Sequence, residues 1–313
     1  MENFKEKWSL NDEKKQRVIL SKAAFLVLMQ DMDRFDAGNN KSGFVNRIML
    51  EYAKQSDAVR LLIASTPAEK GKAFNVRLSN EAENLIFNQL REEQEKKYKS
   101  AGALIKAVIE EYSMLSLPQR EAIYFNKKKE TIESFIANKQ AFRVQILGYY
   151  YDIRPYMFVV DPVTQYNYLI AFSKKMDERS DLEILVSMRL SRINDRIRPI
   201  PREKRSGKIT FQDKKIVSAR LEECTPAFLM NHSVDVKVRF SKDGIRRYKE
   251  IFYLRPQYTS IEKGDIYNFN CSLFQAEGFF IRLGRDVEIL EPPELRERFK
   301  EIYRDCNDIY NKK

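Results

Sequence analysis

A strand–helix–helix pattern occurs twice in the first third of the chain, and this repeat limits how that third can fold. Residues 17–21 and 75–79 alternate apolar and polar side chains, as a short β-strand does, and two helical patterns follow each of them. One short strand buries almost nothing alone, so we expect the two strands to pair antiparallel above the helices. A shift of sixty residues superimposes Phe44, Val45, Ile48, Met49, Glu51 and Tyr52 on Leu104, Ile105, Val108, Ile109, Glu111 and Tyr112.

This order of elements resembles the ribbon-helix-helix fold, whose strand pair enters the DNA major groove. The resemblance covers residues 14 to about 115. Alternation would point Val18, Leu20, Val76 and Leu78 inward. The outward side chains, and a helix cap predicted at Ser42, are then candidate nucleic-acid contacts: Lys15, Arg17, Ile19, Ser21, Ser42, Asn75, Arg77 and Ser79. Gly102 stands where the first copy has Ser42. A scaffold or dimerisation module that binds no nucleic acid fits the same pattern.

Charge favours a polyanionic partner. The 313 residues include 56 lysines and arginines and 45 aspartates and glutamates, which gives a formal net charge of +11. A cation placed on a phosphate releases condensed counterions, so such a surplus favours nucleic acid. Residues 174–215 concentrate it, with thirteen basic side chains against seven acidic ones. A soluble basic protein without such a partner shares this composition.

The sequence offers little acid–base or metal chemistry. Its only histidine is His232, and it has no glycine-rich phosphate loop, nucleophile elbow or cluster of metal ligands. Cys224, Cys271 and Cys306 are far apart, which favours a reducing cytoplasm over a disulfide framework. No apolar run approaches 18 residues, and the first residues lack an apolar signal core. We therefore expect a cytoplasmic, non-enzymatic protein without a cofactor, a metal or a membrane span.

Short strands separated by turns fill the middle of the chain, at residues 141–147, 149–155, 156–160, 166–172 and 185–190. Many short strands at close spacing predict a small β-barrel. Pro155 lacks an N–H group, so it limits the strand after it to an edge or to a strand start.

Two of these strands resemble the signature strands of the WYL domain, a small Sm-like (SH3-like) barrel of prokaryotic nucleic-acid-responsive regulators. The first runs over residues 166–171 and contains Tyr168 and Leu169, with Asn167 where the family has tryptophan. The second runs over residues 188–193 and carries Arg189 and Arg192. An Arg-Pro pair before an apolar strand, at residues 154–155, is also similar to the family.

The resemblance implies that this barrel senses a nucleic-acid ligand through Tyr168, Arg189 and Arg192, with Arg154 in support. A guanidinium matches phosphate oxygens with a rigid fork and stays charged at cellular pH, and an adjacent aromatic ring can stack a base. Tyr150, in the run at residues 149–151, is a further candidate stacking surface. The alternatives are a core tyrosine at 168, a structural ion pair at Arg192 and an ordinary strand edge at Tyr150.

The last third of the chain predicts an α+β module. Residues 234–240 alternate strictly, residues 241–253 follow a helical pattern with Ile245, Tyr248 and Phe252 inward, and a last helix spans residues 294–310. The segment 283–296 resembles the closing part of the WYL C-terminal extension, a ferredoxin-like unit. We therefore expect a multidomain α+β chain: tandem ribbon-helix-helix repeats in 1–118, a WYL barrel in 119–205 and the extension, a possible dimerisation module, in 206–313.

The combination of these three modules resembles the WYL accessory proteins of type VI-D CRISPR systems, which stimulate an RNA-guided ribonuclease. The resemblance implies a homodimeric accessory protein that binds single-stranded RNA, with DNA as another possible ligand, and modulates a CRISPR effector ribonuclease. The alternative is a transcription regulator, whose ribbon reads duplex DNA through Arg17 and Arg77 while its barrel senses a nucleotide or an oligonucleotide. The sequence leaves RNA against DNA preference, ligand identity and length, and the module that dimerises undetermined.

Overall fold

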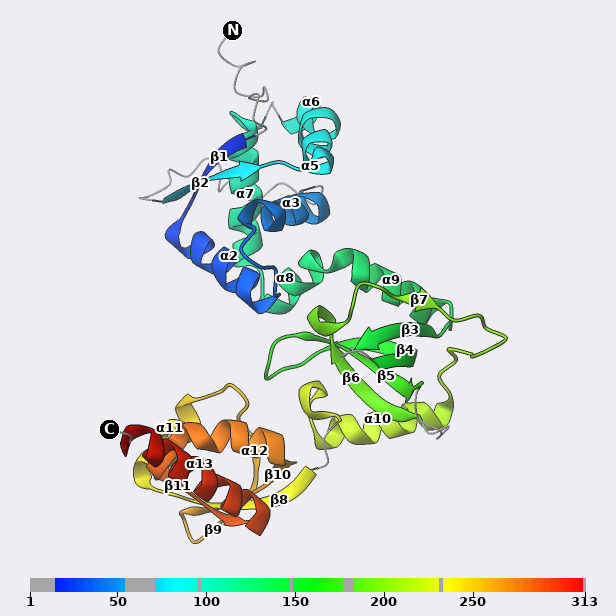
Figure 1. The fold of residues 1–313 in the computed structure, drawn as a ribbon. Helices are drawn as coiled ribbons and strands as arrows, with labels where there is room; N and C mark the ends of the chain where they lie inside the picture. Colours follow the sequence, from blue (N-terminus) through cyan, green and yellow to red (C-terminus); the bar gives the residue numbers. More distant parts are fainter. Residues whose placement is uncertain are drawn as a thin grey trace. The chain divides into compact units, whose positions relative to one another are not determined.

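The computed structural model folds the chain into two compact units (Figure 1). Described residues up to Glu130 belong to the first unit and those from Thr131 to the second. His232 lies outside the described residues. No helix in the described part of the chain is both long enough and apolar enough to cross a membrane. The described residues are 15–53, 71–94, 97–146, 149–176, 183–230 and 233–311.

A two-stranded antiparallel ribbon forms one side of the first unit. β1 (Lys15–Leu20) pairs with β2 (Lys72–Arg77) over the length of both strands, as predicted. The side chains expected to point inward are buried: Val18, Leu20, Val76 and Leu78. The helices of this unit are α2 (Lys22–Arg34), α3 (Lys41–Tyr52), α5 (Asn80–Asn84), the π-helix η1 (Leu85–Gln89), α6 (Arg91–Gln94), α7 (Ala101–Met114), α8 (Leu117–Tyr124) and α9 (Asn126–Ala137), which reaches into the second unit.

The two copies of the repeat share their helix caps. Ser21 caps α2 and Ser79 caps α5, each through its hydroxyl oxygen. Asn40 caps α3 through its side-chain amide oxygen, and Ser100 caps α7 through its hydroxyl oxygen. The cap predicted at Ser42 is therefore wrong by two residues, because the Asn40 side chain already accepts the first unpaired helical N–H group.

Each ribbon strand is held by a helix start of the other copy. Ser42 Oγ accepts the backbone N–H of Arg77 at 3.0 Å. At the equivalent place in the second copy, a Cβ atom on Gly102 would lie 2.8 Å from the carbonyl oxygen of Arg17. Only glycine lets α7 approach β1 this closely. The serine-to-glycine difference between the copies thus has a packing cause.

A buried charge joins three helices of the first unit. Asp31 on α2 is fully buried and accepts hydrogen bonds from Arg120 Nε at 2.6 Å and from the Tyr112 hydroxyl at 3.0 Å. Burial, and then the charge of Asp31, raise the pKa of Tyr112, so its hydroxyl remains a donor. Removing Arg120 would take away the nearest cation of a buried carboxylate, which costs up to about 3–5 kcal/mol.

A five-stranded antiparallel sheet forms the core of the central part, in the order β6-β5-β4-β3-β7. One face packs against Ile132 and Phe135 of α9, and the other face packs against Val217 of α10 (Phe211–Glu223). Figure 1 shows the two helices on opposite faces of the sheet. The strands are β3 (Phe142–Ile146), β4 (Tyr149–Val160), β5 (Asn167–Lys175), β6 (Ile184–Arg189) and β7 (Arg198–Pro199).

The central sheet differs from the predicted barrel in two ways. β4 is one continuous central strand, so the predicted strand break after Pro155 is wrong. Pro155 lies at a shift in the pairing register with β5, where the sheet does not need the backbone N–H that proline lacks. The described strands form an open sheet, and no pairing of β6 with β7 closes it. β7 has only two residues, one of them a proline, and therefore offers little backbone for further pairing.

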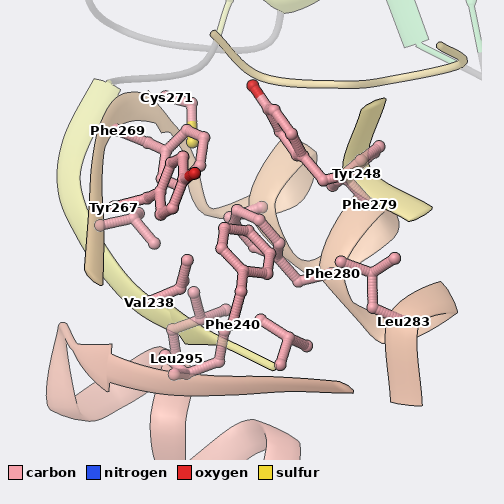
Figure 2. Packing of buried hydrophobic residues seen from close by; sticks show 14 of the residues in the cluster. Val238, Phe240, Tyr248, Tyr267, Phe269, Cys271, Phe279, Phe280, Leu283 and Leu295 are labelled. Atoms are coloured by element: carbon pink, nitrogen blue, oxygen red, sulfur yellow. The ribbon is translucent and has the colours of Figure 1, made fainter. Parts of the chain in front are cut away.

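The C-terminal part has the βαββαβ order of a ferredoxin-like unit, and its sheet order is β11-β8-β10-β9. Aromatic rings fill its core: the Phe240 ring meets that of Tyr267 edge-on at 5.0 Å (Figure 2). Phe252, which was predicted to point inward, is 69% exposed because α11 ends before it. The elements are β8 (Ser233–Phe240), α11 (Lys242–Glu250), β9 (Tyr258–Glu262), β10 (Ile266–Ser272), α12 (Leu273–Phe280), η4 (Ile281–Asp286), β11 (Val287–Glu291) and α13 (Pro293–Asn311).

Candidate nucleic-acid interfaces

The first candidate interface lies where β5 begins and β6 ends. Tyr168 and Arg189 are direct cross-strand partners, so both side chains project from the same face of the sheet. Tyr168 is half-buried against the cluster that contains Ile170 and Phe172. Strand pairing therefore brings together two of the residues that the sequence singled out.

A tyrosine ring supports Arg189. The guanidinium carbon of Arg189 lies 3.2 Å from the centre of the Tyr166 ring. Stacking uses the flat face of a guanidinium, whereas phosphate oxygens bind its N–H edge, so the two contacts are compatible. Sequence reasoning missed Tyr166 as a site residue, although it opens the signature strand.

Arg192 completes this cluster from a turn and not from the predicted strand. β6 ends at Arg189, and the chain continues as the 3-10 helix η2 (Leu190–Arg192), where Arg192 is exposed. Burial raises the pKa of the Tyr168 hydroxyl, while the charges of Arg189 and Arg192 lower it by a smaller amount. Both guanidinium groups thus act on one hydroxyl, which stays protonated at neutral pH. We name Tyr166, Tyr168, Arg189 and Arg192 the tyrosine–arginine cluster.

The turn between β4 and β5 positions Tyr168. Asp161 is fully buried, and its Oδ1 accepts the backbone N–H of Thr164 at 2.6 Å and the Thr164 hydroxyl at 2.9 Å. The Thr164 hydroxyl lies 3.5 Å from the Tyr168 hydroxyl. Asp161 Oδ2 accepts the N–H of Ala227 at 2.9 Å, which ties the turn to the 3-10 helix η3 (Pro226–Phe228). An aspartate followed by proline is a turn signal, and it could have indicated this support.

Arg154 does not join the tyrosine–arginine cluster. Its guanidinium binds Glu183 at 2.6 Å and Asp213 at 3.1 Å, and it donates to the backbone carbonyl of Lys208 at 2.7 Å. Its cross-strand partner is Phe172, four residues along β5 from Tyr168, which corresponds to about 13 Å at strand spacing. The structure therefore uses Arg154 to hold neighbouring segments together.

Tyr150 lies far from the tyrosine–arginine cluster, at the other end of β4. The β4 residue opposite Tyr168 is Val159, nine positions further along the strand. Tyr150 is 46% exposed, and its neighbour Tyr149 lies under the Lys175 ammonium at 4.3 Å from the ring centre.

The second candidate interface is the outer face of the ribbon. Arg17 lies directly opposite Asn75, and Lys15 lies opposite Arg77. The predicted outward side chains of the two strands are exposed: Lys15, Arg17, Ile19, Asn75 and Arg77. These residues include three cations and no acid, which makes the face attractive to a polyanion.

The three serines proposed as nucleic-acid contacts have internal partners, and that of Ser79 is the backbone N–H of Ala82. The Ser21 hydroxyl and backbone N–H both donate to the Glu110 carboxylate, at 2.8 and 2.5 Å. Ser42 accepts the backbone N–H of Arg77. The structure thus places the Ser21 and Ser42 side chains in the packing between strands and helices, and the polar residues of the exposed face are Lys15, Arg17, Asn75 and Arg77.

Known proteins match the C-terminal part of the chain by sequence and nearly the whole chain by fold. Residues 232–306 match the model of the WCX domain. A solved structure described as a CRISPR Cas-related protein matches with a TM-score of 0.72 and 19% identity, over 95% of this chain and 94% of that one. Proteasome accessory factor B/C (PafBC) of Arthrobacter aurescens covers 81% of this chain and 35% of its own, with 15% identity and a TM-score of 0.31, too low to define a shared fold. A search among curated proteins found no match.

The comparisons agree with the WYL-type resemblance of the sequence. The WCX match falls in the segment where the C-terminal extension was predicted, and the near-complete structural match shows that this chain shares the overall fold of that solved structure.

Proposed function

We propose that this chain, which contains a WCX domain and shares the fold of a CRISPR Cas-related protein, is a non-enzymatic accessory protein that binds single-stranded RNA and modulates a CRISPR RNA-guided ribonuclease. In this proposal the ribbon and its helices form a ribbon-helix-helix module, and the open central sheet is an Sm-like unit. The observation that carries the proposal is the tyrosine–arginine cluster. The choice of RNA and of a ribonuclease partner rests on the sequence resemblance to the WYL accessory proteins of type VI-D CRISPR systems.

The cluster has the groups that a single strand requires. Arg189 is oriented by Tyr166, and Arg192 is exposed and forms no ion pair within the described ranges. Two such guanidinium groups can bind neighbouring phosphates, and a half-buried tyrosine ring next to them can contact a base whose partner strand is absent. The charged contacts should make binding tight. Because phosphate and stacking contacts hardly distinguish the four bases, binding should also tolerate changes in the nucleotide sequence.

A competition experiment tests this function. Labelled single-stranded RNA is bound to the full chain at one salt concentration and displaced by unlabelled single-stranded RNA, single-stranded DNA or duplex DNA. The proposal expects single strands to displace the label best and RNA to exceed DNA, with affinity that falls as salt rises. Displacement by duplex DNA alone would contradict it. Target cleavage by the cognate ribonuclease, with and without the protein, tests the accessory role.

The ribbon favours a second function, a transcription regulator that binds duplex DNA. Its outer face carries Arg17, Arg77 and Asn75, residue types that bind guanine and adenine edges in the major groove. Arg17→Ala with Arg77→Ala should then weaken duplex binding by about tenfold or more and leave single-strand binding unchanged. Lys127→Ala with Lys139→Ala, two exposed lysines elsewhere, removes the same charge and is the control.

We also propose a homodimer, with the WCX domain as the dimerisation module. Light scattering of the full chain and of a chain truncated after residue 230 tests it. A dimer that persists after the truncation would assign the contact to another module, and a monomeric full chain would exclude the proposal.

A further inference from the structure

A polar cavity lies on the central sheet, away from the tyrosine–arginine cluster. It has a volume of about 510 Å³ and is open to solvent. Three of its residues form a row across β3, β4 and β5, because Arg143 lies opposite Asp152 and Asp152 lies opposite Lys174. Lys174 is six residues from Tyr168 along β5, a separation of about 20 Å at strand spacing. The cavity is therefore a distinct site.

The cavity keeps a positive charge although two carboxylates line it. Its lining includes Arg143, Lys174, Lys204 and Arg205 against Asp152 and Glu183, so the charged groups sum to two positive charges. On β7, Arg198 lies opposite Arg143 and adds another exposed cation beside the cavity.

The two carboxylates are already bound by arginines. Asp152 accepts Arg143 Nε at 2.7 Å and Nη2 at 3.2 Å. Glu183 accepts hydrogen bonds from Arg154 and from Arg205. Carboxylates held in this way fix the directions of the guanidinium groups. They also leave further N–H groups of Arg143 and Arg205, the two arginines that line the cavity, for an anion. The Nε–H of Arg205 is buried and has no acceptor among the described residues.

An exposed aromatic ring stands beside this charge. Tyr150 is two residues from Asp152 on β4, so both side chains project from the same face as Arg143. The pKa of the Arg143 guanidinium is raised, first by its hydrogen bond to Asp152 and to a smaller extent by Tyr150, which is ionised at the high pH where an arginine titrates, so the two side chains lie near each other. The tyrosine–arginine cluster leaves Tyr150 without a function, and this cavity supplies one.

We propose that this cavity is a second ligand site, in which a nucleotide phosphate binds the Arg143, Lys204 and Arg205 cations and the attached base stacks on Tyr150. The volume is within the range of small-molecule sites, and a base next to a phosphate matches a ring next to a cation cluster. The phosphate belongs either to a free nucleotide or to a nucleic-acid strand, and these share the same chemistry.

Calorimetric titration of the full chain tests the site with ADP, inorganic pyrophosphate and a short single-stranded RNA that carries a 5′ phosphate. Lys204→Ala and Tyr150→Ala are the test variants, because both side chains are exposed and their loss breaks no buried ion pair. The control is Arg189→Ala, which alters only the other site.

We expect ADP to bind the wild type. Lys204→Ala should weaken the affinity for ADP about tenfold, and Arg189→Ala should leave that affinity unchanged. Tyr150→Ala should weaken the affinity for ADP by about fivefold or more and that for pyrophosphate hardly at all, because only ADP has a base to stack. If the RNA binds and depends on Lys204 and Tyr150 while ADP does not bind, the same site takes a strand phosphate. Absence of binding by all three probes, or binding that ignores both test variants, overturns the proposal.

Discussion

Arg154 and Arg189 lie on the same face of one sheet, yet their surroundings give them opposite uses. Arg154 contacts the carboxylates of Glu183 and Asp213, and only 11% of its side chain is exposed. Arg189 contacts the ring of Tyr166, which carries no charge. A carboxylate neutralises an arginine and competes with phosphate, whereas a ring orients the guanidinium and adds no negative charge of its own. In the proposed function, this difference in neighbours separates an arginine that holds the fold from one that binds a polyanion.

The largest effect should follow from removing both arginines of the tyrosine–arginine cluster. Arg189→Ala with Arg192→Ala removes two charge-assisted contacts, each worth about 1.5–3 kcal/mol, so single-strand affinity should fall by about a hundredfold or more. The melting temperature should fall by about 4 °C or less, because Arg192 is exposed and the loss of Arg189 removes a cation–π contact worth about 1 kcal/mol. Fluorescence anisotropy and a thermal melt measure both quantities.

Arg246→Ala with Arg304→Ala is the matched control, since it removes two exposed arginines of the C-terminal part. It changes net charge equally and should alter affinity by less than about threefold. An equal loss in the control would mean that net charge, and not the cluster, binds the strand.

Arg154→Ala should do the opposite. It leaves Asp213 without its arginine and Glu183 with Arg205 alone, so the free energy of unfolding should drop by about 2–3 kcal/mol. Single-strand affinity of the folded protein should change little. Urea denaturation measures the stability, and Arg246→Ala, which breaks exposed pairs only, should cost less than about 0.5 kcal/mol. A variant that keeps its stability and loses affinity would place Arg154 in the binding site.

Sequence reasoning predicted what depends on local periodicity. The alternation in residues 17–21 and 75–79 indicated the exposed face of the ribbon, and the repeat indicated that its strands pair. Cap chemistry is less specific, because an asparagine at position 40 and a serine at position 42 are both good caps.

What the sequence could not provide depends on long-range contacts. The acids that hold Arg154 are 29 and 59 residues away, and no periodicity connects them. The turn after Arg189 separates the two cluster arginines onto different elements, whereas the spacing alone predicted one strand. The strand register also places Tyr150 near Arg143 and far from Tyr168. Predicting this would have required the pairing of β3, β4 and β5, which the sequence does not give.

Removing the ring under Arg189 should have a smaller effect than removing the arginine. Tyr166→Leu keeps an apolar side chain but loses the cation–π contact, worth about 1 kcal/mol, so single-strand affinity should fall by about fivefold. Tyr166→Phe keeps the ring and should bind like the wild type. If both variants lose affinity equally, the tyrosine hydroxyl and not the ring is required.

The smallest effect concerns pH and the Tyr168 hydroxyl. Its pKa is raised chiefly by burial, although Arg189 and Arg192 pull it down, so the hydroxyl remains neutral beyond the point near pH 10 where an ordinary tyrosine is half ionised. If the Tyr168 hydroxyl ionised in this range, the phenolate would repel phosphate. The affinity of the wild type would then fall between about pH 9 and 10, whereas that of Tyr168→Phe would not. We expect the ratio of the two affinities to stay constant from about pH 7 to 10. Exposed lysines and RNA bases titrate in both proteins, so the ratio isolates Tyr168. A ratio that declines with pH would show that the burial of this ring is too slight to keep it neutral beside the bound strand.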